Sequence, residues 1–321
     1  MLELTDTPVL VTGGNGFVGG ALAAGLAAAG AQVTALVRRP GDHPGLGSPN
    51  ITQVEGDFVD PVTARQACEG AAVVVHCAAT LGADLEDARR VNVGGTATLA
   101  AAARQAGCRR FVHISTLSVY DWESGRKVFD ESAPLKSTVK AYAHTPAASP
   151  HYGLSKAEGE RVLAAEMERG LPATVFRLAA VLGVHPTSSW AVLVPAKVRV
   201  GQVSLTGDGT DPLPWTHVEN LWHAMLLALA QEAASGRIYN LVDGHVTWGR
   251  YVEDIRSWFP DAPKAPLIPR DHPPFLGHSS ADRIRAELGY APLRTYEEGM
   301  AEAAAWWREH EQLPETPAEP A

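Results

Sequence analysis

Residues 8–19 read PVLVTGGNGFVG, a short apolar run that passes directly into closely spaced glycines and then into an alanine- and leucine-rich helical pattern. The order strand, glycine loop, helix is typical of a dinucleotide-binding unit. In such a unit Gly13 permits the tight turn, Gly16 lets backbone approach a pyrophosphate, and Gly19 lets the helix pack closely on the strand. Helix amides then face the phosphates. The alternative, a glycine-rich turn without a ligand, is disfavoured by this context.

The second predicted strand, residues 32–37, ends in Arg38 and Arg39. A site for NAD has an acidic residue roughly 20 positions beyond the glycines, whereas an arginine there accommodates the 2′-phosphate of NADP. The first acidic residue after this strand is Asp42, already inside a loop. Arg38 therefore favours NADP(H), with NAD possible. The alternative is a solvated basic pair at a strand end.

Strands and helices alternate through the rest of the first half. We predict strands over residues 51–54, 71–77 and 111–114, and helices over residues 61–69 and 86–105. The run 71–77 is apolar apart from His76, as expected of a strand that is buried on both faces. The alternation predicts an α/β fold with a doubly wound parallel sheet.

Tyr152 is the only tyrosine with a lysine four residues downstream, Lys156. Positions i and i+4 share one face of a helix. An ammonium beside a phenol stabilises the phenolate and lowers the phenol's pKa, which suits a group that exchanges a proton near neutral pH. Because an exposed helix can carry such a pair by chance, the interpretation depends on the glycine motif.

Taken in chain order, these motifs resemble those of the extended short-chain dehydrogenase/reductase family. Residues 12–19 are similar to its cofactor loop, and residues 114–120, ISTLSVY, to its catalytic-hydroxyl strand. Three further segments resemble the family's adenine-contacting acid, the strand end beneath the cofactor and a helix motif: GD at 56–57, HCAA at 76–79 and NVGGT at 92–96. The resemblance covers about the first 245 residues. The 3β-hydroxysteroid dehydrogenase-like and dihydroflavonol reductase-like branches are nearest, on residues 37–39, 113–116 and 217–220.

The resemblance implies a Rossmann-type oxidoreductase that transfers a hydride between the nicotinamide of NADP(H) and a secondary alcohol or ketone. It implies Thr116, Tyr152 and Lys156 as catalytic residues, with Lys156 also holding the nicotinamide ribose. Ser115 is a rival for the catalytic hydroxyl. The candidate cofactor-binding residues are Gly13, Gly16, Phe17, Val18, Arg38, Asp57, Phe58, Cys77, Ala78, Ala79, Lys156, Leu178 and Val181.

Several residues depart from the family's usual pattern. Arg177-Leu178 replaces Arg-Pro, and Asp121 replaces a glycine. Leu117-Ser118 stands where the family's dehydratases carry Asp-Glu, which disfavours a dehydratase. Leu213 stands where the family's sugar-nucleotide epimerases carry an arginine that binds the substrate's diphosphate. Leucine has no hydrogen-bond donors for a diphosphate, so a nucleotide-sugar substrate is disfavoured.

The second half is less regular. We predict a Rossmann domain over 1–178 to which 215–245 return, a smaller, mostly helical substrate lobe over 179–214 and 246–311, and a disordered tail over 312–321. Within them we expect helices over 190–200 and 218–231, strands over 202–205 and 238–242, a loop over 206–214, and a partly mobile flap over 120–149. Five apolar residues are candidates for a pocket wall or, equally, for core: Trp190, Val192, Leu193, Leu213 and Trp215. As a wall they suit a largely apolar substrate.

Composition narrows the classes further. The net charge of −9 without a basic stripe disfavours nucleic acid, and neither the three cysteines nor the twelve histidines have metal-binding spacing. No apolar stretch reaches about 18 residues and no signal peptide is visible, so we expect a cytoplasmic protein that does not enter membranes. The resemblance also implies a homodimer in which the alanine-rich helices 86–105 and 152–168 pair into a four-helix interface.

Two other functions stay open. An epimerase or isomerase would keep NAD(P) tightly bound, and a non-catalytic NADP-binding protein would use the fold without chemistry. The complete set Thr116, Tyr152 and Lys156 counts against the non-catalytic function, because a sensor has no need of a proton relay.

Overall fold

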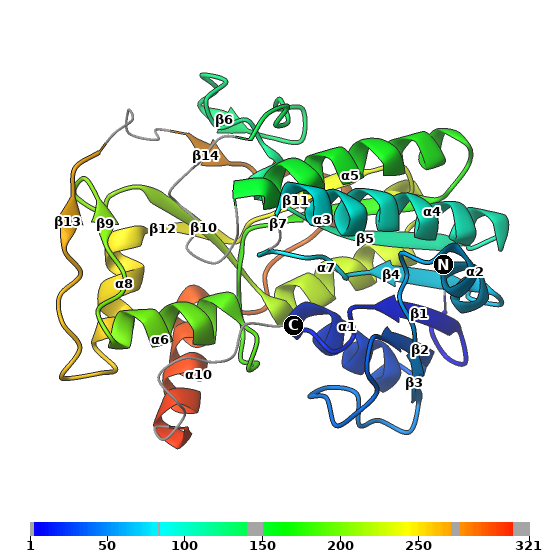
Figure 1. The fold of residues 1–321 in the computed structure, drawn as a ribbon, viewed down its shortest axis with the longest axis horizontal. Helices are drawn as coiled ribbons and strands as arrows, with labels where there is room; N and C mark the ends of the chain where they lie inside the picture. The colour runs from blue at the N-terminus through cyan, green and yellow to red at the C-terminus, as the bar shows by residue number, and fades with distance from the viewer. Residues whose placement is uncertain (1–2, 83, 140–149, 271–276, 311–321) are drawn as a thin grey trace.

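The computed structural model describes residues 3–82, 84–139, 150–270 and 277–310 (Figure 1). A larger α/β part contains the amino-terminal half of the chain, and a smaller lobe lies beside it. The boundaries proposed for the two domains stay a prediction, and the tail 312–321 falls outside the described residues.

The larger part is built on a seven-stranded sheet in the order β11-β7-β5-β4-β1-β2-β3. All neighbouring strands in it are parallel, which confirms the predicted doubly wound sheet. The order reverses between β1 and β4, and ligands of such sheets bind at this point, beyond the carboxyl ends of the strands. The strands are β1 (Pro8–Thr12), β2 (Gln32–Val37), β3 (Ile51–Glu55), β4 (Val73–His76), β5 (Arg110–Thr116), β7 (Ala173–Leu178) and β11 (Ile238–Leu241).

Helices cover both faces of this sheet (Figure 1). One face carries α1 (Phe17–Ala28) and α7 (Val218–Ala230), and the other carries α2 (Pro61–Cys68), α4 (Thr96–Gln105) and α5 (Pro150–Glu168). The helix predicted over 86–105 is interrupted: α3 (Leu85–Arg89) and α4 are joined by a π-helical segment, η1 (Arg90–Gly95). Such segments are frequent at functional sites.

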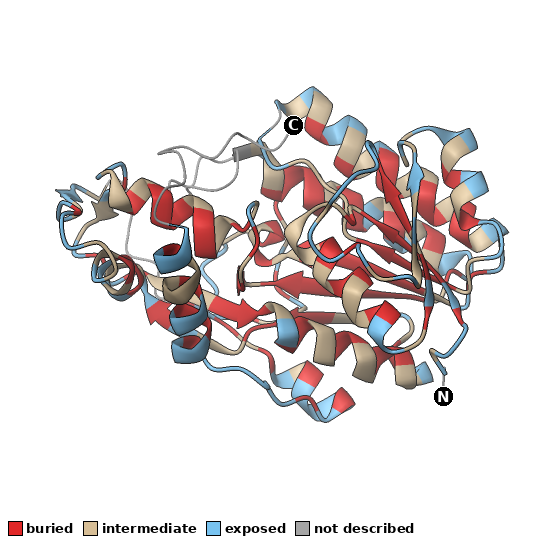
Figure 2. Cartoon of the chain, turned by 90° about the horizontal axis from the view of Figure 1, so that it is seen from below, coloured by how far each residue is buried: buried red, intermediate tan, exposed pale blue. Residues whose placement is uncertain are grey.

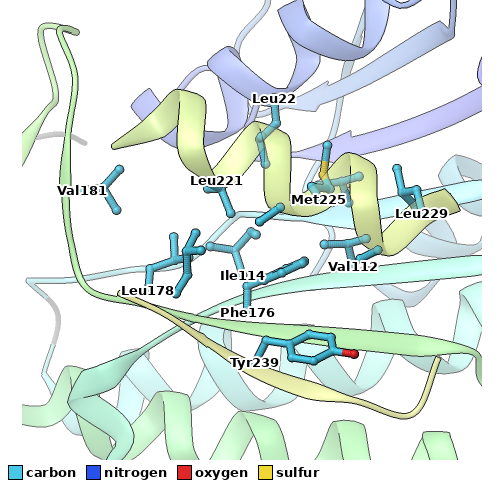
Figure 3. Packing of buried hydrophobic residues seen from close by; sticks show 14 of the residues in the cluster. Leu22, Val112, Ile114, Phe176, Leu178, Val181, Leu221, Met225, Leu229 and Tyr239 are labelled. Atoms are coloured by element: carbon cyan, nitrogen blue, oxygen red, sulfur yellow. The ribbon is translucent and has the colours of Figure 1, made fainter. Parts of the chain in front are cut away.

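The main core lies between the sheet and the helices α1 and α7 (Figure 3). Ile114 of β5 and Phe176 of β7 face Leu221 and Met225 of α7. Each such side chain contributes about 1.5–3 kcal/mol when it is fully buried. Burial is concentrated in the sheet and the inner helix faces (Figure 2), so the site at the strand ends rests on a firmly packed base.

The lobe contains a second sheet in the order β12-β10-β8, made of β8 (Ala180–Leu182), β10 (Pro212–His217) and β12 (Gly244–Thr247). The predicted loop 206–214 was wrong at its end, because β10 begins at Pro212. Pro212 and Pro214 pair only with β12, since β8 joins β10 from Trp215 onward. A proline lacks the N–H for a second neighbour and is tolerated at such an edge.

Short elements complete the lobe and tie it to the sheet. The predicted strand 202–205 is found only as β9 (Leu205–Thr206), paired with β13 (Leu267–Ile268). The predicted helix 190–200 consists of a π-helical segment, η3 (Ser189–Leu193), and α6 (Val194–Arg199). The remaining helices are α8 (Trp248–Arg256), α9 (Asp282–Leu288), which packs against β11 and α7, and α10 (Tyr296–Glu309).

The described part of the expected flap, up to residue 139, contains packed residues on either side of an exposed run over 123–128. Phe129 is fully buried, β6 (Val128–Phe129) pairs with β14 (His278–Ser279), and Tyr120 forms a bridge with Leu135. Residues 140–149 lie outside the described part, and movement of the segment stays a prediction.

Candidate active site

The glycine loop forms a cradle in which Gly13 and Gly19 leave no room for a side chain. Gly13 has a φ of +71°, and a Cβ atom there would lie 2.8 Å from the backbone of Ala78. A Cβ atom at Gly19 would lie 2.1 Å from the carbonyl oxygen of Gly13. No side chain caps α1 at Gly16, so its first amides remain available to an anion such as a dinucleotide phosphate. This part of the chain therefore fits the predicted cofactor.

The other cofactor candidates lie around the carboxyl ends of neighbouring strands. Arg38 is exposed directly after β2, and Asp57, which is exposed after β3, accepts a hydrogen bond from the Val59 amide at 3.0 Å. Phe58 packs edge-on against His76, with ring centroids 5.1 Å apart. Cys77, Ala78 and Ala79 follow β4 and are partly exposed, as are Phe17 and Val18. Leu178 and Val181 are buried at one end of the main core (Figure 3).

Helix α5 begins in direct contact with the turn that follows β5. A Cβ atom at Gly153 would lie 2.3 Å from the carbonyl oxygen of Ser118. The amide of Ser118 in turn donates a hydrogen bond to Thr116 Oγ1 at 3.1 Å. The glycine thus brings the backbone next to Tyr152 against the turn that holds Thr116. Thr116 and Tyr152 are both partly exposed, as groups that meet a substrate must be.

The rival hydroxyl, Ser115, is committed elsewhere. Its Oγ donates to Glu160 Oε1 at 2.5 Å, and Glu160 forms an ion pair with Arg177 at 2.7 Å. All three side chains are buried. Because strand side chains alternate between faces, Ser115 points toward α5. This geometry favours Thr116 as the hydroxyl that contacts a substrate.

Lys156 does not contact Tyr152 in the way the spacing suggested. Its Nζ donates to the carbonyl oxygen of Ile114 at 2.8 Å and lies 3.2 Å from His113 Nε2. Burial lowers the pKa of Lys156 to about 8, against the opposing effects of Glu160 and Cys77. Burial also raises the pKa of Tyr152 to about 12. The expected lowering of the phenol's pKa was therefore wrong for the protein alone, because the ammonium is held by other acceptors.

Two histidines at the strand ends have roles that sequence reasoning missed. His76 bridges Thr12 Oγ1 at 2.8 Å and Thr96 Oγ1 at 3.1 Å. Since Thr96 donates its proton to the Asn92 carbonyl, His76 donates through Nε2 and accepts from Thr12 through Nδ1. His113 lies beside it on β5. The strand period of two places His113 on the same face as Ser115, which is the signal that could have found it.

Asn92, in the π-helical segment, is a third missed residue. Its amide donates to the Thr80 carbonyl and to Ser155 Oγ, both at 3.0 Å, and its Oδ1 accepts from the Thr80 amide at 2.9 Å. Asn92 thereby ties the segment after β4 to the face of α5 next to Lys156.

The proposed pocket wall divides into two groups. Val192, Leu213 and Trp215 are buried in the lobe's hydrophobic clusters and serve as core. Trp190 and Leu193 are partly exposed, so they alone keep surface with which a substrate could pack. Among the described residues, no group of three His, Cys, Asp or Glu side chains could hold a metal ion, and no helix is long and apolar enough to span a membrane.

The chain is similar to known proteins over most of its length. The model of the NAD dependent epimerase/dehydratase family matches residues 9–241. The chain is 30% identical to 4-hydroxy-2-methyl-3-oxo-4-farnesyl-3,4-dihydroquinoline-1-oxide ketoreductase of Stigmatella aurantiaca, over 90% of this chain and 93% of that protein. It is 28% identical to 3-beta-hydroxysteroid dehydrogenase of Mycolicibacterium neoaurum, over 93% and 91%.

Other similar proteins act on nucleotide sugars by name. The chain is 30% identical to dTDP-glucose 4,6-dehydratase of Streptomyces griseus, over 95% of each protein. The solved structure of MoeE5 in complex with UDP-glucose and NAD superposes with a TM-score of 0.76 and 25% identity, over 95% of this chain and all of that one.

Proposed function

Because the chain belongs to the NAD dependent epimerase/dehydratase family, we propose that it is an NADP(H)-dependent oxidoreductase acting on a secondary alcohol or ketone of a largely apolar substrate. The observation that carries the proposal is the contact of Gly153 with the turn after β5, which sets the Tyr152 helix against Thr116. The glycine cradle would hold the dinucleotide at the adjoining strand ends.

Each catalytic candidate has a role that fits its surroundings. Thr116 would orient the substrate oxygen by a hydrogen bond, and Tyr152 would exchange a proton with it. Because burial raises the pKa of Tyr152 to about 12, the phenol is protonated at neutral pH and can donate to a ketone oxygen. Lys156 would bind the nicotinamide ribose. The bound dinucleotide supplies or takes up the hydride at its nicotinamide.

Two observations support an apolar ketone or alcohol over a nucleotide sugar. Leu213, at the position of the epimerases' diphosphate-gripping arginine, is buried in the core of the lobe. The nearby Arg270 is held by both carboxylate oxygens of Asp211, at 2.8 and 2.7 Å, so its charge is already compensated. The ketoreductase and hydroxysteroid dehydrogenase relatives bear names of the same reaction class.

The decisive experiment is a panel of ketones and secondary alcohols assayed with NADPH, NADP⁺, NADH and NAD⁺. Tyr152→Phe serves as the inactive control, and Arg38→Ala as the variant expected to lose preference for the phosphorylated cofactor. Turnover of an apolar ketone that depends on Tyr152 supports the proposal. Equal use of both cofactors by wild type and Arg38→Ala would contradict the NADP assignment.

A second candidate is an epimerase or isomerase with retained dinucleotide, favoured by the similarity to proteins named for UDP-glucose and dTDP-glucose. Purified protein carrying nicotinamide dinucleotide that is released only on denaturation would favour it. Retention without turnover of any panel member or sugar nucleotide would favour a non-catalytic NADP-binding protein. Light scattering would test the predicted homodimer, and fractionation of cells the predicted cytoplasmic location.

A further inference from the structure

We propose that His113 is a positioning residue for Lys156, whose neutral imidazole accepts one N–H bond of the ammonium and aims another toward the dinucleotide ribose. The inference deepens the function proposed above and rests on it. His113 is fully buried on β5, and its Nε2 lies 3.2 Å from Lys156 Nζ.

The contact between His113 and Lys156 matters because the ammonium has a limited number of N–H donors. A lysine ammonium has three N–H donors and no acceptor. In this structure one donor is taken by the carbonyl oxygen of Ile114 at 2.8 Å, and a second is directed at His113. With two of three donors fixed, rotation about the last bond of the side chain is locked and the direction of the third donor is set.

The contact also fixes the tautomer of His113. To accept from an ammonium, Nε2 must be free of a proton, and the proton then resides on Nδ1. His113 Nδ1 is buried and has no hydrogen-bond partner among the residues that the structure describes. A buried N–H without a partner lowers stability, whereas a leucine would fill the space without that cost. The imidazole is therefore explained better by its action on Lys156 than by packing.

The charges around Lys156 are consistent with a neutral acceptor. Burial, and then the charge of Lys156, hold the pKa of His113 well below its usual range. The titratable groups that face Lys156 are His113 from β5, His76 from β4, Cys77 after β4 and Glu160 from α5. Glu160 is engaged by Ser115 and Arg177, so the direct acceptors of the ammonium are His113 and the Ile114 carbonyl.

The test compares His113→Leu, which removes the acceptor, with His113→Gln, whose Oε1 can replace Nε2. His217→Gln is the matched control, because His217 is a buried imidazole that contacts Glu302 and the Glu219 amide instead. We expect His113→Leu to weaken NADPH binding, measured by calorimetry, and to lower kcat, each by about 10-fold or more, the usual effect of a lost hydrogen bond to a charged group. His113→Gln should recover most of both, and the control should change neither.

A double-mutant cycle separates positioning from structure. In a Lys156→Met background, His113→Leu should weaken NADPH binding no further. An undiminished additional loss in that background would show a merely structural role and overturn the proposal. So would a His113→Leu protein with wild-type NADPH affinity and an unchanged pH profile of kcat, or a His113→Gln protein as impaired as His113→Leu.

Nitrogen-15 NMR of the His113 imidazole in unliganded wild-type protein tests the tautomer without an activity assay. Because it needs no variant, it tests the proposal even if His113→Leu does not fold. An unprotonated Nε2 supports the proposal, and a protonated Nε2 overturns it. If wild type binds no nicotinamide dinucleotide, the proposed function fails and this inference falls with it, whereas dinucleotide binding with a protonated Nε2 defeats the inference alone.

Discussion

Tyr152 is the residue on which the proposed chemistry depends. In the proposed mechanism its hydroxyl donates the proton, and phenylalanine keeps the ring while removing that hydroxyl. We expect Tyr152→Phe to lower kcat by about 2–3 decades, the usual scale of a general acid–base group. NADPH affinity, measured by fluorescence titration, should stay unchanged. Turnover close to that of wild type would remove Tyr152 from the mechanism.

Gly153 controls the approach of the same helix. A Cβ atom there would lie 2.3 Å from the backbone oxygen of Ser118, which cannot rotate away as a side chain would. We expect Gly153→Ala to shift the start of α5 and lower kcat/KM by about 100-fold, as misplacements near 1 Å do.

The control for this substitution is Gly94→Ala, where a Cβ atom would meet nothing closer than the Arg89 carbonyl at 3.8 Å. Thermal unfolding should show both variants folded. If Gly153→Ala turns over substrate as Gly94→Ala does, the close approach has no catalytic role.

Between elements, a buried ion pair joins α5 to β7. Glu160 and Arg177 side chains are 4% and 3% exposed, and Arg177 also donates to the Tyr120 hydroxyl at 2.8 Å. Removing one partner leaves an uncompensated charge in the interior, so Glu160→Ala should lower the free energy of unfolding by about 3–5 kcal/mol.

Urea unfolding measures this difference, with Glu253→Ala as the control. Glu253 pairs with Arg256 on an exposed face of α8, where such pairs contribute about 1 kcal/mol or less. Equal losses of unfolding free energy in the two variants would show that the buried pair between α5 and β7 stabilises the protein no more than an exposed pair does.

At the same scale, sequence pattern predicted most elements and missed their irregularities. Apolar runs and glycine breaks predicted β2, β4 and α7 close to their observed bounds and placed β1 and α1 on either side of the glycine loop. The π-helical segment around Asn92 was not foreseeable, because it depends on contacts with Thr80 and Ser155 from distant parts of the chain. The first three residues of β10 were assigned to a loop, because prolines disfavour a strand until the missing neighbour is known.

For the whole molecule, buried neutral histidines predict acid sensitivity. Burial lowers the pKa of His76 to about 3 and that of His113 well below its usual range. As pH falls below about 6.5 the unfolded chain takes up protons that the folded protein does not, so the free energy of unfolding decreases. Each such histidine contributes about 1.4 kcal/mol per pH unit between about pH 6 and pH 5.

Urea unfolding across this interval measures how steeply the free energy of unfolding changes with pH. Burial also lowers the pKa values of His185 and His245, so these two histidines add to the slope. Above about pH 6.5 their contribution to stability is fully present. His76→Gln should reduce this slope by the contribution of one histidine. A free energy of unfolding that is constant between about pH 6 and pH 5 would contradict the prediction.

The sequence by itself determined the parallel sheet and the glycine loop, because periodicity and glycine spacing can be read directly from the order of residues; it marked Tyr152 and Lys156 only as candidates. Only the tertiary structure engaged Ser115 with Glu160 while leaving Thr116 partly exposed, gave Lys156 its acceptors and placed Leu213 in the core. Those outcomes depend on which side chains from β5, α5 and the lobe meet, and on how far burial shifts their pKa values, which no single segment encodes.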